Sequence, residues 1–109
     1  MPNYSKNNII LVRYPFSNLS NSKVRPAVVV STAHVSQDII IIPLTSKTAK
    51  LLSGEFVLLD WSKEGLNVPT AVKRGLYTVE SRLTSKIIGK LSKVDAQKLA
   101  VSLQSWLGL

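Results

Sequence analysis

The chain contains no cysteine, so it has no disulfide and no thiolate to serve as a nucleophile or metal ligand. Its single histidine, His34, stands in a polar stretch where a solvated side chain is the ordinary expectation. The carboxylates are scattered without the spacing of metal ligands or of glycosidase acids, and no glycine-rich phosphate loop or serine–histidine–aspartate arrangement is present. We therefore expect neither a metal nor a cofactor.

Long apolar runs are missing as well. The longest covers residues 39–44 and is too short to cross a bilayer, and the polar residues 1–8 lack the apolar core of a signal peptide. The sequence therefore predicts a cytoplasmic protein without membrane contact, which also suits the absence of cysteine. Its 109 residues are expected to form one domain over 1–109.

Acidic residues are few: six Asp and Glu stand against fourteen Lys and Arg, which gives a net charge of +8. An excess of this size attracts polyanions such as nucleic acid, an acidic membrane or an acidic protein. Because the basic residues are spread along the chain and form no tail, we expect them on the surface of a folded domain. Charge alone leaves the class of partner open.

The hydrophobic pattern predicts several short strands. Residues 27–30 are small and mostly β-branched, and residues 39–42 are four isoleucines, so the strands that contain them are expected to be buried on both faces. The polar residues 16–23 are expected to form a loop. The expected strands are 8–14, 25–31, 38–44, 54–61, 70–74, 76–79 and 86–91.

Residues 92–107 form the one helix that the sequence predicts. Ser92 is a good N-cap, Asp95 is placed to reach back to it and to meet the helix dipole, and Gly108 ends the helix. The apolar residues expected to pack on the sheet are Ala96, Leu99, Leu103, Trp106 and Leu107. The pattern indicates a mostly β protein with a C-terminal helix, built as a small antiparallel barrel or curled sheet, and a dimer that covers leftover apolar edges.

Polar side chains with phosphate chemistry stand at the ends of the two buried strands. Arg25 precedes Pro26, which biases its backbone toward extended geometry, while Thr45 and Ser46 follow the strand over 38–44. If the two strands are antiparallel neighbours, these groups and Lys47 meet at one rim. Such a cluster suits a phosphodiester, and RNA supplies its own 2′-hydroxyl nucleophile. From the strand alone, a solvated arginine or one paired with a carboxylate is the alternative.

The fragments that carry these groups resemble the MazF/PemK family of type II toxin–antitoxin ribonucleases. The strongest match is Arg-Pro-Ala-Val-Val-Val-Ser at residues 25–31, and the others are residues 9–20, 42–46, 65–70 and 88–91. The resemblance covers nearly the whole chain. It implies an SH3-like barrel, a homodimer, and metal-independent cleavage of single-stranded RNA that leaves a 2′,3′-cyclic phosphate and a 5′-hydroxyl.

The resemblance also assigns roles to residues. Arg25 matches the catalytic arginine of the family, which implies that it stabilises the phosphorane and takes part in proton transfer. Thr45 matches the catalytic threonine, which implies a hydrogen bond to the scissile phosphate. An acidic antitoxin protein is implied as a partner that covers the site. The residues expected to contact RNA are Phe16, Ser20, Lys23, Ser46, Lys47 and Lys73.

Two other functions remain open at this point. A gyrase-poisoning toxin of the CcdB family shares the architecture and has a helix that ends near a tryptophan, of which residues 106–109 (Trp-Leu-Gly-Leu) are reminiscent. A nucleic-acid-binding barrel without activity would stack bases on Tyr14, Phe16 or Tyr77. The pairing of Arg25 with Thr45 favours the ribonuclease, because a gyrase poison needs neither.

Overall fold

Three antiparallel strands form the centre of the computed structural model, which describes residues 4–14 and 23–109. They are β1 (Asn8–Tyr14), β2 (Lys23–Val29) and β3 (Asp38–Thr45). Strand β1 pairs with β2, and β2 pairs with β3, both in antiparallel register. The predicted strand over 8–14 is confirmed, and the predicted neighbour relation of the next two strands is confirmed with slightly shifted ends.

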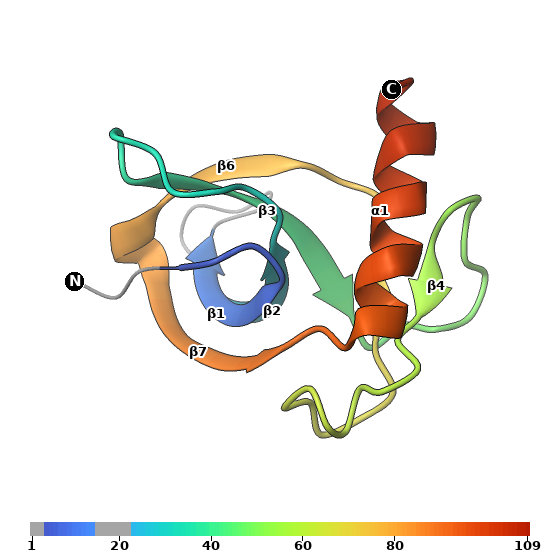
Figure 1. The fold of residues 1–109 in the computed structure, drawn as a ribbon. Coiled ribbons are helices and arrows are strands. Elements are labelled where there is room, and N and C mark those ends of the chain that lie inside the picture. Colours follow the sequence, from blue (N-terminus) through green and yellow to red (C-terminus); the bar gives the residue numbers. More distant parts are fainter. Residues whose placement is uncertain (1–3, 15–22) are drawn as a thin grey trace.

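Shorter elements complete a sheet of seven strands in the order β4-β5-β3-β2-β1-β7, with β6 paired to β3 beside this path. In Figure 1, β3, β6 and β7 surround β1 and β2, so the sheet curls on itself, while α1 stands to one side near β4. The fold is therefore the predicted mostly β, antiparallel architecture with a C-terminal helix. The remaining elements are β4 (Phe56–Val57), β5 (Ala71–Val72), β6 (Tyr77–Glu80), η1 (Ser81–Leu83), β7 (Thr84–Lys90) and α1 (Lys93–Leu107).

The central strands are buried on both faces, as their continuous apolar runs predict. Successive residues of a strand point to opposite sides, so each strand supplies two separate clusters. The inner cluster, inside the curl, consists of Tyr4, Ile10, Val12, Ala27, Val29, Ile39 and Ile41. The helix-side cluster consists of Ile9, Val28, Ile42, Leu44, Leu58, Val72, Leu91 and Leu99. Of the four isoleucines, Ile40 alone is exposed, at 37%.

The expected strand over 54–61 is wrong in extent, because only Phe56–Val57 is a strand. The alternation of burial continues, with Leu58 buried and Leu59 exposed, and the N–H of Leu58 still donates to the carbonyl of Thr70. The chain then turns because the backbone N–H groups of Leu59 and Asp60 donate to the carboxylate of Asp95 in α1. The carboxylate of Asp95 thus accepts the two N–H groups that a longer β4–β5 ladder would need as donors.

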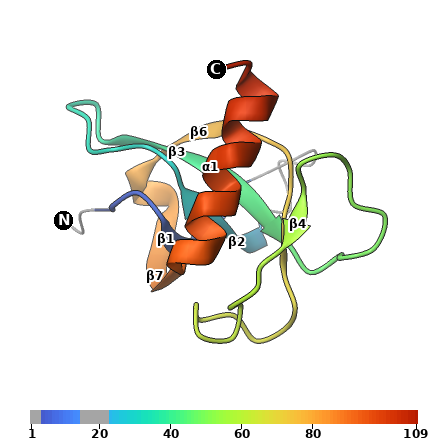
Figure 2. The ribbon, with the colours of Figure 1, turned by 45° about the vertical axis from the view of Figure 1, so that its right-hand side comes forward.

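Helix α1 is close to its predicted bounds. The hydroxyl of Ser92 accepts from the N–H of Asp95 at 3.2 Å, and Gly108 ends the helix with a left-handed backbone at φ 69°. Ala96, Leu99, Leu103 and Trp106 pack on the helix-side cluster, whereas Leu107 remains 49% exposed. Figure 2 shows α1 lying across the face of β2 and β3. Within the described residues, α1 is too short and too polar to cross a membrane.

Candidate functional site

Arg25 stands near the beginning of β2, opposite Val12 of β1, and its side chain is exposed. The backbone on either side is held in the β1–β2 ladder, and the following residue, Pro26, restricts it further. Lys23 lies two residues earlier in the same strand and therefore projects from the same face as Arg25. One face of β2 thus presents two cations to solvent.

Thr45 is the last residue of β3 and is half-buried. Its hydroxyl oxygen accepts a hydrogen bond from the backbone N–H of Lys47 at 3.1 Å, a local turn typical of threonine. The hydroxyl keeps its own hydrogen as a donor, because an alcohol both accepts and donates. Ser46 and Lys47 follow and are exposed, so a hydroxyl, a second hydroxyl and a cation stand in succession at the end of a buried strand.

The register of the two strands relates Arg25 to Thr45. The last pair between β2 and β3 is Ala27 with Pro43, and two further steps in this register put Arg25 opposite Thr45. The ladder ends before that point, because the last two residues of β3 pair with β5 instead. Both residues therefore stand at the same end of the β2–β3 pair, where the strands cease to be bonded to each other.

Lys73 is brought to the same end by β5. Val72 pairs with Leu44, and the N–H of Lys73 donates to the carbonyl of Pro43 at 3.0 Å. The lysine side chain is exposed. Of the residues expected at the site, the structure thus brings Arg25, Thr45, Ser46, Lys47 and Lys73 to one end of adjoining strands, with Lys23 beside Arg25. The predicted RNA contacts Phe16 and Ser20 lie outside the described residues.

His34 belongs to the opposite end of β2, in the connection to β3. It is exposed, and its Nδ1 is 2.8 Å from the hydroxyl oxygen of Ser36. The histidine is therefore far along the strand from Arg25, in the solvated loop position that the sequence predicted.

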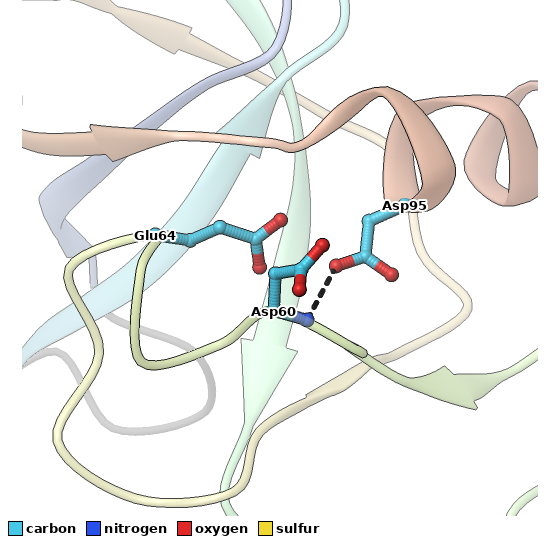
Figure 3. Close-up of side chains that lie close together, drawn as sticks. All are labelled: Asp60, Glu64 and Asp95. Carbon is cyan, nitrogen blue, oxygen red and sulfur yellow. Dashed lines mark hydrogen bonds between the residues drawn. The ribbon is translucent and has the colours of Figure 1, made fainter.

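The structure also assembles a carboxylate cluster that the sequence analysis missed. Asp60, Glu64 and Asp95 each offer an oxygen within 4.8 Å of the others, at the N-terminus of α1 (Figure 3). Asp95 is fully buried and Glu64 is 1% exposed. Asp60 and Glu64 come from the turn after β4, more than thirty residues before Asp95. The only signal in the sequence was Asp95 near the N-cap.

Hydrogen bonds from the backbone hold the cluster. Asp95 accepts from Leu59 and Asp60 at 2.9 and 3.1 Å, and Glu64 Oε2 accepts from the N–H of Ser92 at 2.7 Å. The reach back to the N-cap that was predicted for Asp95 is thus made by Glu64, a correction that follows from the turn bringing Glu64 over the helix end. The other oxygen of Glu64, Oε1, is buried without a partner.

The environment of Glu64 favours its protonated form. Burial, and then the neighbouring Asp95, raise the pKa of Glu64 to about 7. Carboxylates gathered in this way are the ligand type that hard cations prefer. Here three backbone N–H groups and the positive end of the helix dipole already compensate much of the charge. A proton on Glu64 removes a further negative charge.

A curled antiparallel sheet with one C-terminal helix is the MazF-like fold. The family model of PemK-like, MazF-like toxins of type II toxin–antitoxin systems matches residues 5–107, so the chain belongs to this family. A search of curated protein sequences found no significant match.

Solved structures agree with the fold. MazF from Deinococcus radiodurans superposes with a TM-score of 0.79 at 20% identity, covering 100% of both chains. The Mycobacterium tuberculosis toxin MazF-mt6 gives 0.74 at 20% identity, covering 94% of this chain and 97% of its own. A mycobacterial endoribonuclease, solved in complex with its cognate antitoxin, gives 0.77 at 15% identity, covering 97% of this chain and 96% of its own.

Proposed function

We propose that this chain is the toxin of a type II toxin–antitoxin system and acts as a metal-independent endoribonuclease on single-stranded RNA, above all mRNA. The observation that carries the proposal is the convergence of Arg25 and Thr45 at one end of the β2–β3 pair, in a member of the MazF-like family. The positive charge of the chain supports it, since a net charge of +8 attracts a polyanion.

The proposed reaction uses the RNA as its own nucleophile. The 2′-oxygen loses its proton and bonds to the adjacent phosphorus, the bond from phosphorus to the 5′-oxygen breaks, and that oxygen takes up a proton. The products are a 2′,3′-cyclic phosphate and a free 5′-hydroxyl. No metal-bound water is required, because the nucleophile is internal to the substrate. The protein has to position the phosphate, stabilise added charge and move protons.

The residues divide this work. The guanidinium of Arg25 faces the phosphorane, whose extra negative charge a planar fork of donors stabilises, and takes part in proton transfer. The hydroxyl hydrogen of Thr45 bonds a non-bridging phosphate oxygen. Neighbouring phosphates and bases of the RNA are bound by Phe16, Ser20, Lys23, Ser46, Lys47 and Lys73.

We further propose an acidic antitoxin and a homodimer as the assembly of this protein. Support for the antitoxin comes from the mycobacterial endoribonuclease solved with its cognate antitoxin and from MazE–MazF complexes of Deinococcus radiodurans, to which this chain is similar. An acidic segment suits a basic rim by the same electrostatics as RNA.

The gyrase-poison alternative rested on the tryptophan near the end of the helix. In the structure Trp106 packs on the helix-side cluster, and its indole N–H donates to the carbonyl of Ser53 at 3.0 Å. This tryptophan therefore secures the loop after Thr45 to α1, which gives it a role inside the fold.

Incubation of the purified protein with labelled single-stranded RNA in EDTA tests the proposal. We expect cleavage at short sequences, with 2′,3′-cyclic phosphate on the upstream fragment by mass spectrometry. Arrest of DNA gyrase without RNA cleavage would support the CcdB-like alternative, and RNA binding without cleavage would leave only a nucleic-acid-binding barrel. The folded Arg25→Ala variant serves as the control for a contaminating nuclease.

A further inference from the structure

One carboxylate joins the two segments that carry Lys47, Lys50 and Lys73. Glu55 Oε1 accepts from the backbone N–H of Leu52 at 2.7 Å, and Glu55 Oε2 accepts from the backbone N–H of Arg74 at 2.8 Å. The N–H of Glu55 in turn donates to the carbonyl of Leu52 at 2.9 Å. Glu55 therefore ties the loop after β3 to the segment after β5, which lies nineteen residues further along the chain.

Both segments are anchored near Thr45. The first begins directly after Thr45 and carries Lys47 and Lys50 before it reaches Leu52. The second carries Lys73, whose N–H donates to the carbonyl of Pro43 in β3. The carboxylate of Glu55 thus connects the two segments that flank the end of β3.

Helix α1 also holds the segment after β3, through two hydrogen bonds. The hydroxyl of Ser102 donates to the carbonyl of Gly54 at 2.7 Å, and the indole of Trp106 donates to that of Ser53 at 3.0 Å. Gly54 has a left-handed backbone at φ 86°, and a Cβ there would stand 2.4 Å from Trp106 Nε1. The loop is therefore bonded to the helix at Ser53 and Gly54. The hydrogen bond from Arg74 to Glu55 connects this part of the loop to the segment after β5.

The charge of Glu55 is unexpected on a rim that binds phosphates. An acidic residue close to Lys73 and Arg74 repels RNA, so electrostatics alone favours its removal. Hydrogen bonds from Arg74 and Leu52, and then the charges of Lys73 and Arg74, lower the pKa of Glu55, so it stays ionised in the pH range of an RNA assay.

We propose that Glu55 is a positioning residue for RNA binding: its carboxylate holds the backbone segments that present Lys47, Lys50 and Lys73 to the phosphates. The inference rests on the proposed ribonuclease function and adds to it a residue that the family resemblance did not supply. Glu55 touches neither the RNA nor the reacting atoms in this role.

Glu55→Gln separates positioning from charge by the sign of its effect. An amide has one acceptor oxygen, so the variant loses one of the two backbone bonds while it also loses the repulsive charge. Charge removal predicts tighter binding of RNA, and loss of positioning predicts weaker binding. We expect the Kd for an RNA with a 2′-deoxy nucleotide at the cleavage position to rise about tenfold, and KM to rise with kcat nearly unchanged.

Two further variants complete the design. Glu55→Asp keeps the charge but is too short to span both N–H groups, so we expect binding to weaken here as well. Glu80→Gln makes the same charge change beside Arg82, at the Asp38 end of β3 away from Thr45, and we expect unaltered binding. Amide NMR resonances of Leu52 and Arg74 should shift in both Glu55 variants without RNA and stay in place in Glu80→Gln.

The outcomes distinguish the inference from the function on which it rests. Wild-type or tighter RNA binding by folded Glu55→Gln overturns the positioning role while leaving the ribonuclease intact. Unmoved resonances of Leu52 and Arg74 overturn it independently of any RNA. A wild-type protein that neither binds nor cleaves RNA overturns the proposed function and the RNA role of Glu55 together.

Discussion

At the scale of single residues, Arg25 combines a fixed backbone with an exposed side chain. The β1–β2 ladder and Pro26 hold the main chain, so the guanidinium starts from a defined point at the rim. Because the main chain is fixed in advance, less reorganisation is needed when the guanidinium meets a phosphorane. The contribution of this arginine is therefore expected to fall on the rate of cleavage more than on the affinity for RNA.

Arg25→Ala should lower the cleavage rate by about a hundredfold to a thousandfold, because a transition-state charge contact of roughly 3–4 kcal/mol is lost. Arg25→Lys should also cleave poorly, because a point charge does not reproduce the planar fork. Single-turnover kinetics on labelled RNA measures both variants. Circular dichroism and Tm establish that they are folded, and near-normal cleavage by folded Arg25→Ala would remove Arg25 from the mechanism.

At the scale of elements, the turn after β4 is attached to α1 through buried carboxylates. Asp95 accepts two N–H groups of the turn, and Glu64 of the turn accepts the N–H of Ser92 at the helix start. Because the pKa of Glu64 is raised from 4.5 to about 7, the folded protein binds more protons than the unfolded chain between these values. This group therefore makes stability fall as pH rises through that window.

Glu64→Gln should remove this dependence, since its amide does not ionise and its oxygen can still accept from the N–H of Ser92. From the pKa of about 7, the wild type should lose roughly 3 kcal/mol relative to the variant between about pH 4.5 and pH 8. Denaturant unfolding across this range measures the difference.

Glu80→Gln, at an exposed carboxylate, is the control and should keep the slope of the wild type. If Glu64→Gln and the wild type change in parallel with pH, Glu64 titrates near its ordinary pKa and this prediction is wrong.

At the scale of the whole molecule, many large apolar side chains remain on the surface of the described chain. Exposed fractions are 63% at Leu59 and 67% at Leu52, and they reach 87% at Leu109 and 93% at Val35. Scattered apolar residues are normal on a monomer, but the strands of the sheet also expose apolar side chains, and we expect a second copy to cover part of this surface. The exposed apolar residues in strands are Val24, Ile40, Val57, Tyr77 and Ile87. The apolar residues exceed what two clusters around three strands can cover.

We expect a homodimer in solution. Sedimentation equilibrium at micromolar concentration should give twice the 12.0 kDa of the chain. A stable 12.0 kDa species over that range would contradict the dimer and leave the exposed apolar residues to another partner.

The charge of the molecule leads to a prediction about salt. If RNA binds at Lys23, Lys47 and Lys73 as proposed, binding releases counterions, so log Kd should rise with log salt by about 0.7 for each phosphate neutralised on a single strand. An acidic antitoxin that adds apolar anchors should depend less on salt, because those contacts are not screened. Affinities for non-cleavable RNA and for the acidic partner over one salt series test this. A flat RNA series would contradict a cationic rim.

The sequence predicted features formed by residues close together in the chain better than contacts between residues far apart in it. The strand over 8–14, the two buried strands and the C-terminal helix followed from periodicity and capping within a few neighbouring residues. The strand over 54–61 failed because Asp95, outside that segment, takes the N–H groups of Leu59 and Asp60. The candidate rim was predicted in part, since the antiparallel neighbours were expected, whereas the link of Glu55 to Arg74 was not.

By itself the sequence determined the order of the elements, their buried faces, the excess of positive charge and the resemblance to the MazF/PemK family. These properties are encoded by short contiguous stretches, whose periodicity and composition act locally. The tertiary structure alone decided which groups meet: the switch of β3 from β2 to β5 at Thr45, the shared environment of Glu64 and Asp95, and the connection through Glu55. Each is a contact between residues far apart in the chain, and such contacts exist only once the whole sheet has closed around its core.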